Sequence, residues 1–440
     1  MLIYYCGQII TLAEGLGVIN GGAIVVNGDC IVEVGDYDDI KGKFAEEPEK
    51  KIDGLVTPGL INLHHHLYSS LARGWNPGVA PESFYEILKN IWWRLDRALS
   101  EDEIYYSALI GLIDSIRCGV TTVVDHHSSQ TVIDGSLDLV GNAFQESGGR
   151  GSICFEISDR NGAIQSLAGL NENIRALQKW RRGDDGLISP MCGLHGSFTL
   201  SDSTLEQIAS RTGDLNCGYH FHLLEDDCDR KLSVSQFNSP PLDRFIKYGL
   251  VNQSTIAAHG LHLDADEIGR LHDTGATLAH CPRSNLNNAV GVINYEEAFG
   301  TGLHIGIGTD GMDGNCLSDA LIAVLLCKDR TANPNSGFQE VADSLMNING
   351  FAFEKISGQK VGKIYPGYKA DFVVWDYDPP TTLDNSNFGA HVFYGLSQAR
   401  VNSVWVNGRN VYADHQLTTM DEAAIRARCR ELSSKLWKRL

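Results

Sequence analysis

The chain has 440 residues, 43% of them apolar, which is enough for a large core or for more than one domain. Its formal net charge of −19 argues against nucleic acid or an anionic membrane as a partner, because both bind positively charged surfaces. No charged segment followed by an apolar run stands at the start, and the longest apolar run, residues 321–327, is too short to cross a bilayer.

Eleven cysteines are scattered along the chain without a CxxC pair. An odd number of dispersed cysteines is typical of reduced, mostly buried thiols in a cytosolic protein. We therefore expect a cytoplasmic protein without a disulfide framework or a zinc ribbon.

The two ends of the chain share one pattern. Residues 1–54 and 368–412 both consist of short apolar runs separated by glycines, and each contains an Asn-Gly pair between two runs. These pairs are Asn27-Gly28 and Asn407-Gly408. Asn-Gly between apolar runs indicates a β-hairpin. We expect both ends to build one small β-sandwich domain, followed by an amphipathic helix at the end of the chain.

Between these ends, strand-like runs alternate with helical ones. The strand candidates are residues 55–64, 120–126, 151–156, 187–195, 217–223, 254–259, 275–280 and 303–310, and the helical candidates include 82–98, 102–117, 171–182 and 264–273. This order predicts an α/β fold, a (β/α)8 TIM-like barrel, with a doubly wound open sheet as the alternative. The predicted domains are 1–54 with 364–415 for the sandwich, 55–363 for the catalytic barrel and 420–440 for the C-terminal helix.

Strand after strand ends in a histidine or a carboxylate. These residues are His64 and His66, His126, Glu156, His195, His220 and His222, His259, His280 and Asp310. In a barrel the carboxyl ends of the strands meet at one mouth, where catalytic residues lie, whereas an open sheet would spread them along a line. So many polar residues at strand ends favour the barrel.

Three consecutive histidines end the first of these strands. Side chains alternate along a strand, so His64 and His66 point to one face and His65 to the other. Two imidazoles on one face suit a divalent transition metal, because neutral imidazole is a good ligand. A polar loop or an expression-tag tract is the alternative, but this run is internal and has apolar flanks.

Two further motifs offer ligands or catalytic groups. In His220-Phe-His222-Leu-Leu-Glu225 the histidines share a strand face and the glutamate follows in the loop above; two core histidines beside a surface glutamate are the alternative. Asp310 follows an apolar strand and suits a metal shell, with a helix N-cap as the alternative. The literal GxGxxG match at residues 306–311 is a poor dinucleotide site, because its aspartate would repel pyrophosphate.

The segments PGLINLHHHL, HFHLLE, AAHGLHL, HCPRSNLNN and GIGTDG occur in this order. Together they resemble the signature series of the amidohydrolase superfamily, in its branch of cytosine deaminases and chlorohydrolases. The segments IWWRLDRAL, VVDHHSS, CFEISDRNG and RSNLNNAVG resemble the SsnA-type aminohydrolases of that branch most closely. The resemblance runs over essentially the whole chain.

The resemblance implies roles for particular residues. It implies His64, His66, His222 and Asp310 as metal ligands, Glu225 as proton shuttle, His259 as the group that polarises the water or the intermediate, and His195, His280, Ser284 and Asn285 as substrate contacts. Ser197 replaces the proline that is usual in the branch, which leaves the shape of the pocket open. Binuclear members carry a carboxylated lysine near the fourth strand, and residues 187–201 contain no lysine. We therefore expect one divalent metal ion, zinc, with iron as the alternative.

The predicted activity is deamination of an amino-substituted N-heterocycle, a small-molecule substrate. A divalent metal lowers the pKa of water to about 7, so the activated water attacks the ring carbon and ammonia leaves. Asp310 would accept the proton of the water, and Glu225 would protonate the ring nitrogen and the leaving amine. The alternatives are hydrolysis of a cyclic or linear amide or amidine, and a metal-binding barrel without catalysis. The resemblance also implies a homo-oligomer.

Overall fold

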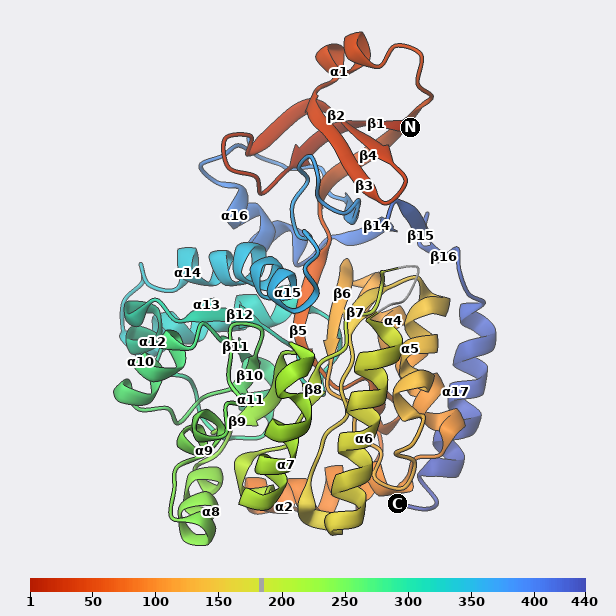
Figure 1. Cartoon of the computed structure of the whole chain (residues 1–440). Coiled ribbons are helices and arrows are strands. Elements are labelled where there is room, and N and C mark those ends of the chain that lie inside the picture. Colours follow the sequence, from red (N-terminus) through yellow and green to blue (C-terminus); the bar gives the residue numbers. More distant parts are fainter. Residues whose placement is uncertain (182–185) are drawn as a thin grey trace.

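The structure is a computed structural model that describes residues 1–181 and 186–440. Strands from both ends of the chain form one eight-stranded sheet. They are β1 (Leu2–Ile10), β2 (Val18–Asn27), β3 (Cys30–Asp36), β4 (Glu49–Pro58), β13 (Phe372–Asp376), β14 (Arg400–Val406), β15 (Arg409–Ala413) and β16 (Gln416–Leu417), in the order β16-β15-β14-β13-β4-β1-β2-β3. Figure 1 shows β1 to β4 at the top of the molecule.

Both predicted hairpins are present in this sheet. Strands β2 and β3 pair across Gly28-Asp29, and β14 and β15 pair across Asn407-Gly408. The φ angles are 60° at Gly28, 50° at Asn407 and 69° at Gly408. Tight two-residue turns need this left-handed backbone, which glycine and asparagine adopt most readily.

The sheet bends strongly enough to bring distant strands into contact. The Nε1–H of Trp405 on β14 donates a hydrogen bond to the hydroxyl of Tyr4 on β1 at 3.1 Å, although β13 and β4 lie between these strands. Phe372 on β13 stacks on Trp405 with ring centroids 4.7 Å apart. The two ends of the chain therefore share one aromatic core.

The middle of the chain alternates parallel strands with helices. Its strands are β5 (Leu60–His65), β6 (Val120–Asp125), β7 (Arg150–Ser152), β8 (Cys192–Gly193), β9 (Tyr219–Leu223), β10 (Ile256–His259), β11 (Thr277–His280) and β12 (His304–Ile307). They form one sheet in the order β5-β6-β7 and a second in the order β12-β11-β10-β9-β8. Isolated parallel bridges pair Gly151 with Ile188, near β7 and β8, and His65 with Asp310, near β5 and β12.

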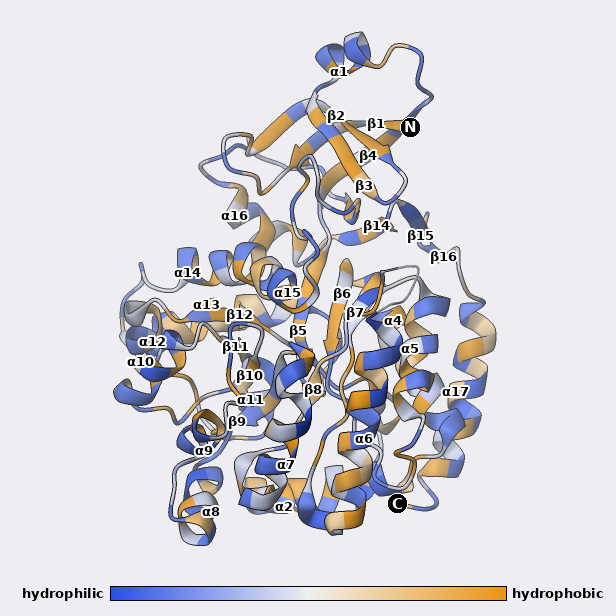
Figure 2. Ribbon diagram, viewed as in Figure 1, coloured by the Kyte–Doolittle hydropathy of each residue, from blue (hydrophilic) through white to orange (hydrophobic). Residues whose placement is uncertain are grey.

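Helices lie around these strands (Figure 1). They are α2 (Phe84–Ile87), α3 (Trp93–Ala98), α4 (Glu101–Arg117), α5 (Ser136–Ser147), α6 (Ala163–Trp180), α7 (Asp202–Thr212), α8 (Asp227–Phe237), α9 (Pro241–Lys247), α10 (Ala265–Asp273), α11 (Pro282–Asn287), α12 (Tyr295–Thr301), α13 (Cys316–Thr331), α14 (Phe338–Asp343) and α15 (Asn349–Ser357), besides α1 (Tyr37–Lys43), α16 (Phe388–His391) and the terminal α17 (Glu422–Leu436). In Figure 2, β5 and β6 are apolar while helices such as α10 carry polar residues. Within the described residues, none of the helices is long and apolar enough to cross a membrane.

The strand predicted at residues 55–64 is two strands in two different sheets, because the chain changes direction after Pro58. The backbone N–H of Gly59 donates to the carbonyl of Asp371 at 3.0 Å. A Cβ at Gly59 would lie 2.1 Å from Oγ1 of Thr121, so only glycine fits where the chain crosses between the sheets. Strand β4 thus runs across residue 54, where we placed the end of the first unit.

Other predicted helices and strands have different limits in the structure. The helix expected at 82–98 is divided into α2 and α3 by a π turn, Leu88–Trp92, and such turns often occur at functional sites. The helix expected at 171–182 begins earlier, as α6, and residue 182 lies outside the described residues. Strands β7 and β8 are shorter than predicted, since only isolated bridges such as Ile157 with Leu194 continue their pairing.

Candidate functional site

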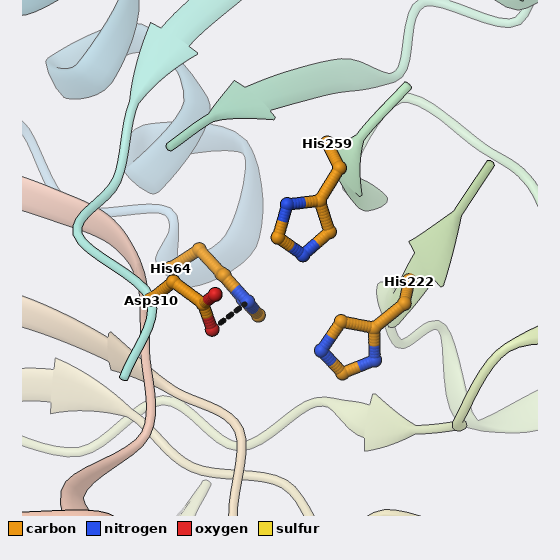
Figure 3. Close-up of side chains that lie close together, drawn as sticks. All are labelled: His64, His222, His259 and Asp310. Carbon is orange, nitrogen blue, oxygen red and sulfur yellow. Dashed lines mark ion pairs between the residues drawn. The ribbon is translucent and has the colours of Figure 1, made fainter. Parts of the chain in front are cut away.

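Five predicted site residues meet at the carboxyl ends of the parallel strands. His64 lies in β5, with His66 just beyond its end, while His222 lies in β9 and His259 ends β10. Asp310 follows β12. One ligand atom from each of His64, His222, His259 and Asp310 lies within 4.8 Å of the other three. Figure 3 shows these four side chains converging from separate strands.

His66 completes the group from the other side. Its Nε2 lies 3.0 Å from Oδ1 of Asp310 and 3.2 Å from Nε2 of His222. The Nε2 of His64 lies 3.4 Å from the same aspartate oxygen. Ligands that share a tetrahedral zinc ion at about 2.0–2.1 Å stand about 3.4 Å apart. The distances from Asp310 to His64 and His66, and from His66 to His222, thus suit a shared ion, while the four-residue group whose ligand atoms all lie within 4.8 Å contains His259 in place of His66.

The hydrogen bonds of these histidines also suit a metal. Nδ1 of His66 bonds the carbonyl of His126 at 2.7 Å, so Nδ1 carries the proton and Nε2 keeps its lone pair. Nε2 of His64 is buried and has no hydrogen-bond partner in the described structure. A buried nitrogen without a partner costs free energy. A divalent cation at this point would satisfy it, so the residues fit the metal.

Burial and hydrogen bonds set the charges of the site. Burial raises the pKa of Asp310, but the neighbouring imidazoles of His64 and His66 outweigh this effect and hold that pKa well below the usual range. Burial lowers the pKa of His259 to about 3, which keeps its imidazole neutral. Burial also raises the pKa of Glu225 well above its ordinary value. The site thus combines a carboxyl group whose pKa is lowered, a neutral imidazole and a carboxyl group whose pKa is raised.

Two residues of the site adopt strained backbone conformations. His259 has a φ of 75° and Asp310 a φ of 54°, which larger side chains rarely adopt. The backbone N–H of Asp310 donates to the carbonyl of His64 at 2.9 Å, and Nδ1 of His65 bonds the carbonyl of Asp310 at 2.7 Å. Strain of this kind persists where surrounding bonds fix it, as at functional sites.

Residues of α11 form hydrogen bonds with the side chains of Asp310 and His259. The Ser284 hydroxyl donates to Oδ2 of Asp310. The side-chain amide of Asn285 donates to Nδ1 of His259 at 2.9 Å, so the neutral ring carries its proton on Nε2. That nitrogen lies 3.4 Å from Oε2 of Glu225. Nε2 of His259 therefore carries a proton but makes no hydrogen bond within the described residues.

A cavity opens beside these groups. Its apolar wall consists of Phe84, Leu88, Trp92, Trp93 and Phe198, and its polar lining includes His66, His195, His222, Glu225, Ser284 and Asp310. His280 and Asn285, predicted to contact substrate, are not among the described residues that line it. Nε2 of His280 instead contacts the hydroxyl of Tyr295 at 2.7 Å.

The cavity also exposes a buried charge cluster that the site prediction missed. Asp96 and Glu156 both line it, and the guanidinium of Arg160 contacts both carboxylates. Burial raises the pKa of Glu156 to about 7, although Arg160 opposes this rise. The position of Glu156 at a strand end could have indicated its place in the site from the sequence. Asp96 lies within a helical segment, where nothing distinguished it from a surface residue.

Two histidines that the sequence left without a role have structural partners. His126 accepts the hydrogen bond of His66 through its carbonyl, and its ring Nε2 donates to the carbonyl of Leu194 at 3.0 Å. Nε2 of His127 bonds the Ser129 hydroxyl at 2.9 Å. His126 thus supports a candidate ligand, whereas His127 faces away from the group.

Alternating parallel strands and helices, with imidazoles and carboxylates at the strand ends, define a metal-binding enzyme of the TIM-barrel type. The chain belongs to the amidohydrolase family, which it matches over residues 55–411. Together with the deaminase names of its sequence relatives, this makes it a hydrolase that acts on carbon–nitrogen bonds, as the sequence predicted.

Relatives with assigned names are similar over nearly the whole chain. The 5-methylthioadenosine/S-adenosylhomocysteine deaminase of Moorella thermoacetica is 29% identical over 426 residues, 93% of this chain and 94% of the relative. An adenosine deaminase from Xanthomonas campestris with bound zinc has a TM-score of 0.85 at 22% identity, covering 99% of this chain and 98% of the other. Escherichia coli guanine deaminase has a TM-score of 0.80 at 19% identity, covering 94% and 100%. These structures share the fold.

Proposed function

We propose that the chain is a metal-dependent aminohydrolase that removes an exocyclic amino group from an N-heterocycle and releases ammonia. The observation that carries this proposal is the convergence of His64, His66, His222 and Asp310 beside Glu225 at the base of an aromatic-walled cavity. Relatives named as adenosine, guanine and 5-methylthioadenosine/S-adenosylhomocysteine deaminases support it.

The proposed ligands of one divalent ion are His64, His66, His222 and Asp310. When bound, the ion supplies a water of lowered pKa, about 7 in zinc enzymes, as the nucleophile. Zinc is the proposed metal, with iron as the alternative. Imidazole and carboxylate ligands suit zinc, and the structural neighbour from Xanthomonas campestris contains it.

Three side chains would move or hold protons. The neighbouring His64 and His66 lower the pKa of Asp310, so it accepts a proton from the water, while Ser284 fixes its other oxygen. Burial raises the pKa of Glu225, so it donates its proton to the ring nitrogen beside the attacked carbon, takes up the hydroxyl proton of the resulting adduct and passes that proton to the leaving amine. The proton held by Asp310 then returns to Glu225. His259 carries its own proton on Nε2, 3.4 Å from Oε2 of Glu225, and polarises the reacting groups.

The cavity wall supports a planar substrate. Trp92, Trp93 and Phe198 offer ring faces on which a heterocycle can stack. We propose His195 and Ser284 as direct contacts, since both line the cavity. His280 and Asn285 lie behind it, and we propose that they act through their hydrogen-bonded neighbours.

The finer architecture is also a proposal. The isolated bridges between the two parallel sheets support closure into one eight-stranded barrel, and the contact of Tyr4 with Trp405 supports a terminal β-sandwich. The domain limits 1–54 with 364–415, 55–363 and 420–440 stay a prediction, although β4 carries the terminal sheet past residue 54, to Pro58. A cytoplasmic location is supported by eleven unpaired cysteines, which suit a reducing compartment. A homo-oligomer is proposed from the family resemblance alone.

Metal analysis combined with an ammonia-release screen of aminated heterocycles tests the function. We expect about one divalent ion per chain, ammonia from at least one heterocycle, and loss of activity on chelation with recovery on adding zinc. Ring opening or amide cleavage without ammonia would instead identify an amide hydrolase. Metal-loaded protein that is inactive on purines, pterins and triazines would contradict the proposal.

A further inference from the structure

His220 is a buried histidine beside the candidate metal site that has no role in the proposed mechanism. It lies on β9, two residues before His222, and is fully buried. Its Nε2 lies 2.8 Å from Nδ1 of His64. His220 is therefore the hydrogen-bond partner of the His64 ring on the side away from Asp310.

The direction of this hydrogen bond follows from the ligand role of His64. A neutral imidazole has one N–H and one lone pair, and a nitrogen must use its lone pair to bind a metal. Nε2 of His64 faces Asp310 and has no hydrogen-bond partner within the described chain, so it is the nitrogen available to the metal. Nδ1 of His64 must then carry the proton and donate it to Nε2 of His220.

Because a neutral imidazole has one N–H and one lone pair, the position of the proton on His220 is also fixed. Because Nε2 of His220 accepts, its proton resides on Nδ1, which lies 3.8 Å from Sγ of Cys154. The thiol of Cys154 donates in turn to the carbonyl of Asp125 at 3.5 Å. Cys154 is fully buried, so no solvent competes for these bonds. A directed chain therefore runs from His64 through His220 and Cys154 to the backbone.

We infer that His220 is a positioning residue, which holds His64 in the tautomer whose Nε2 is free for the metal, and that Cys154 completes the chain behind it. His66 receives equivalent support from the backbone carbonyl of His126, which no side-chain substitution removes. Of these two hydrogen-bond acceptors, the His220 side chain is the one that a substitution can remove. The inference rests on the metal site of the proposed function, but not on the identity of the substrate.

His220→Phe keeps a ring of similar size and removes the acceptor. The proton of His64 then has no partner on Nδ1, and the tautomer with the proton on Nε2, which blocks the metal, becomes competitive. Loss of a partner of this kind typically weakens metal binding about 10–100-fold. His220→Gln retains an acceptor oxygen and should recover most of the affinity. His127→Phe is the matched control, since His127 is equally buried but bonds Ser129.

The measurement is the Zn²⁺ dissociation constant by competition with a chromophoric chelator, together with the visible absorption of the Co²⁺ forms. We expect weaker binding and an altered Co²⁺ spectrum in His220→Phe, and near wild-type values in His220→Gln and His127→Phe. Wild-type affinity in His220→Phe, or equal weakening in His220→Phe and His220→Gln, would overturn the inference. Wild-type protein that binds no divalent ion would overturn the proposed function as well, so the two failures are distinguishable.

Cys154 provides a second test that leaves both histidines in place. Cys154→Ala removes the acceptor of the Nδ1 proton of His220, whereas Cys154→Ser restores a hydroxyl that can both accept and donate. We expect weaker Zn²⁺ binding in Cys154→Ala and recovery in Cys154→Ser. Equal affinities in the two variants would remove Cys154 from the chain. If His220→Phe does not fold, the role of His220 is decided by His220→Gln against His220→Ala, and equally weak Zn²⁺ binding in these two variants would overturn it.

Discussion

Asp310 is subject to two opposing effects on its ionisation. Burial favours the neutral acid, while the neighbouring imidazoles of His64 and His66 favour the carboxylate and prevail. At Glu225 the contact that opposes burial is a long one, with Asn288 at 3.5 Å, so burial dominates and the pKa of Glu225 rises. The pKa values of two carboxyl groups in one cavity are thus shifted in opposite directions, as acid–base catalysis requires.

Asp310→Asn is expected to abolish turnover, with a loss of at least about 10²–10⁴-fold, because an amide accepts no proton from the nucleophilic water. The kcat for ammonia release and the bound metal of the purified variant are the measurements. Retention of the wild-type rate would remove Asp310 from the mechanism.

Glu225→Gln is expected to keep the metal and to lower kcat by about 10²–10⁴-fold, because glutamine cannot carry a proton to the ring nitrogen or to the leaving amine. Glu225 is not a proposed ligand, so metal content should match that of the wild type. If the purified variant lacked metal while remaining folded, Glu225 would be a ligand and its assignment as proton shuttle would be wrong.

At the scale of elements, the features that could be predicted are those marked by the alternation of side chains along a strand or by turn residues. Alternation along a strand placed His64 and His66 on one face, and Asn-Gly pairs located both hairpins. Contacts between distant segments had no such local signal. The bond between His64 and His220 joins residues 156 positions apart, and Asp96 lines the cavity in contact with Arg160, 64 positions along the chain.

Gly59 shows how one element boundary depends on a single side chain. Gly59→Ala would place a Cβ 2.1 Å from Oγ1 of Thr121, between β4 and β5. Overpacking of this kind typically destabilises a protein by about 1–3 kcal/mol, so we expect a free energy of unfolding reduced by that amount. Denaturant unfolding of metal-free protein is the measurement.

Gly7→Ala is the control, because Gly7 lies in β1 and a Cβ there would meet nothing within 4 Å. Its effect on the free energy of unfolding should be small. Equal stability of Gly59→Ala and Gly7→Ala would show that the crossing between the sheets tolerates a side chain.

At the scale of the whole molecule, a buried ion pair connects the parallel strands to the terminal sheet. Arg150 on β7 is fully buried, and its Nε donates to Oδ2 of Asp371 at 2.8 Å. Asp371 directly precedes β13 and accepts a further bond from the backbone N–H of Asn407 at 2.7 Å. One carboxylate thus joins β7, β13 and the β14–β15 turn.

Arg150→Met is expected to lower the free energy of unfolding by about 3–5 kcal/mol, because it leaves the carboxylate of Asp371 buried without its cation. Arg428→Met is the control. Arg428 also bonds two carboxylates, those of Asp102 and Glu431, but these side chains are 58% and 50% exposed, and surface pairs contribute about 0–1 kcal/mol. Chemical denaturation of both variants compares them. If Arg150→Met were no less stable than Arg428→Met, the buried pair would not hold the terminal sheet to the parallel strands, and packing of the surrounding apolar residues would have to do so.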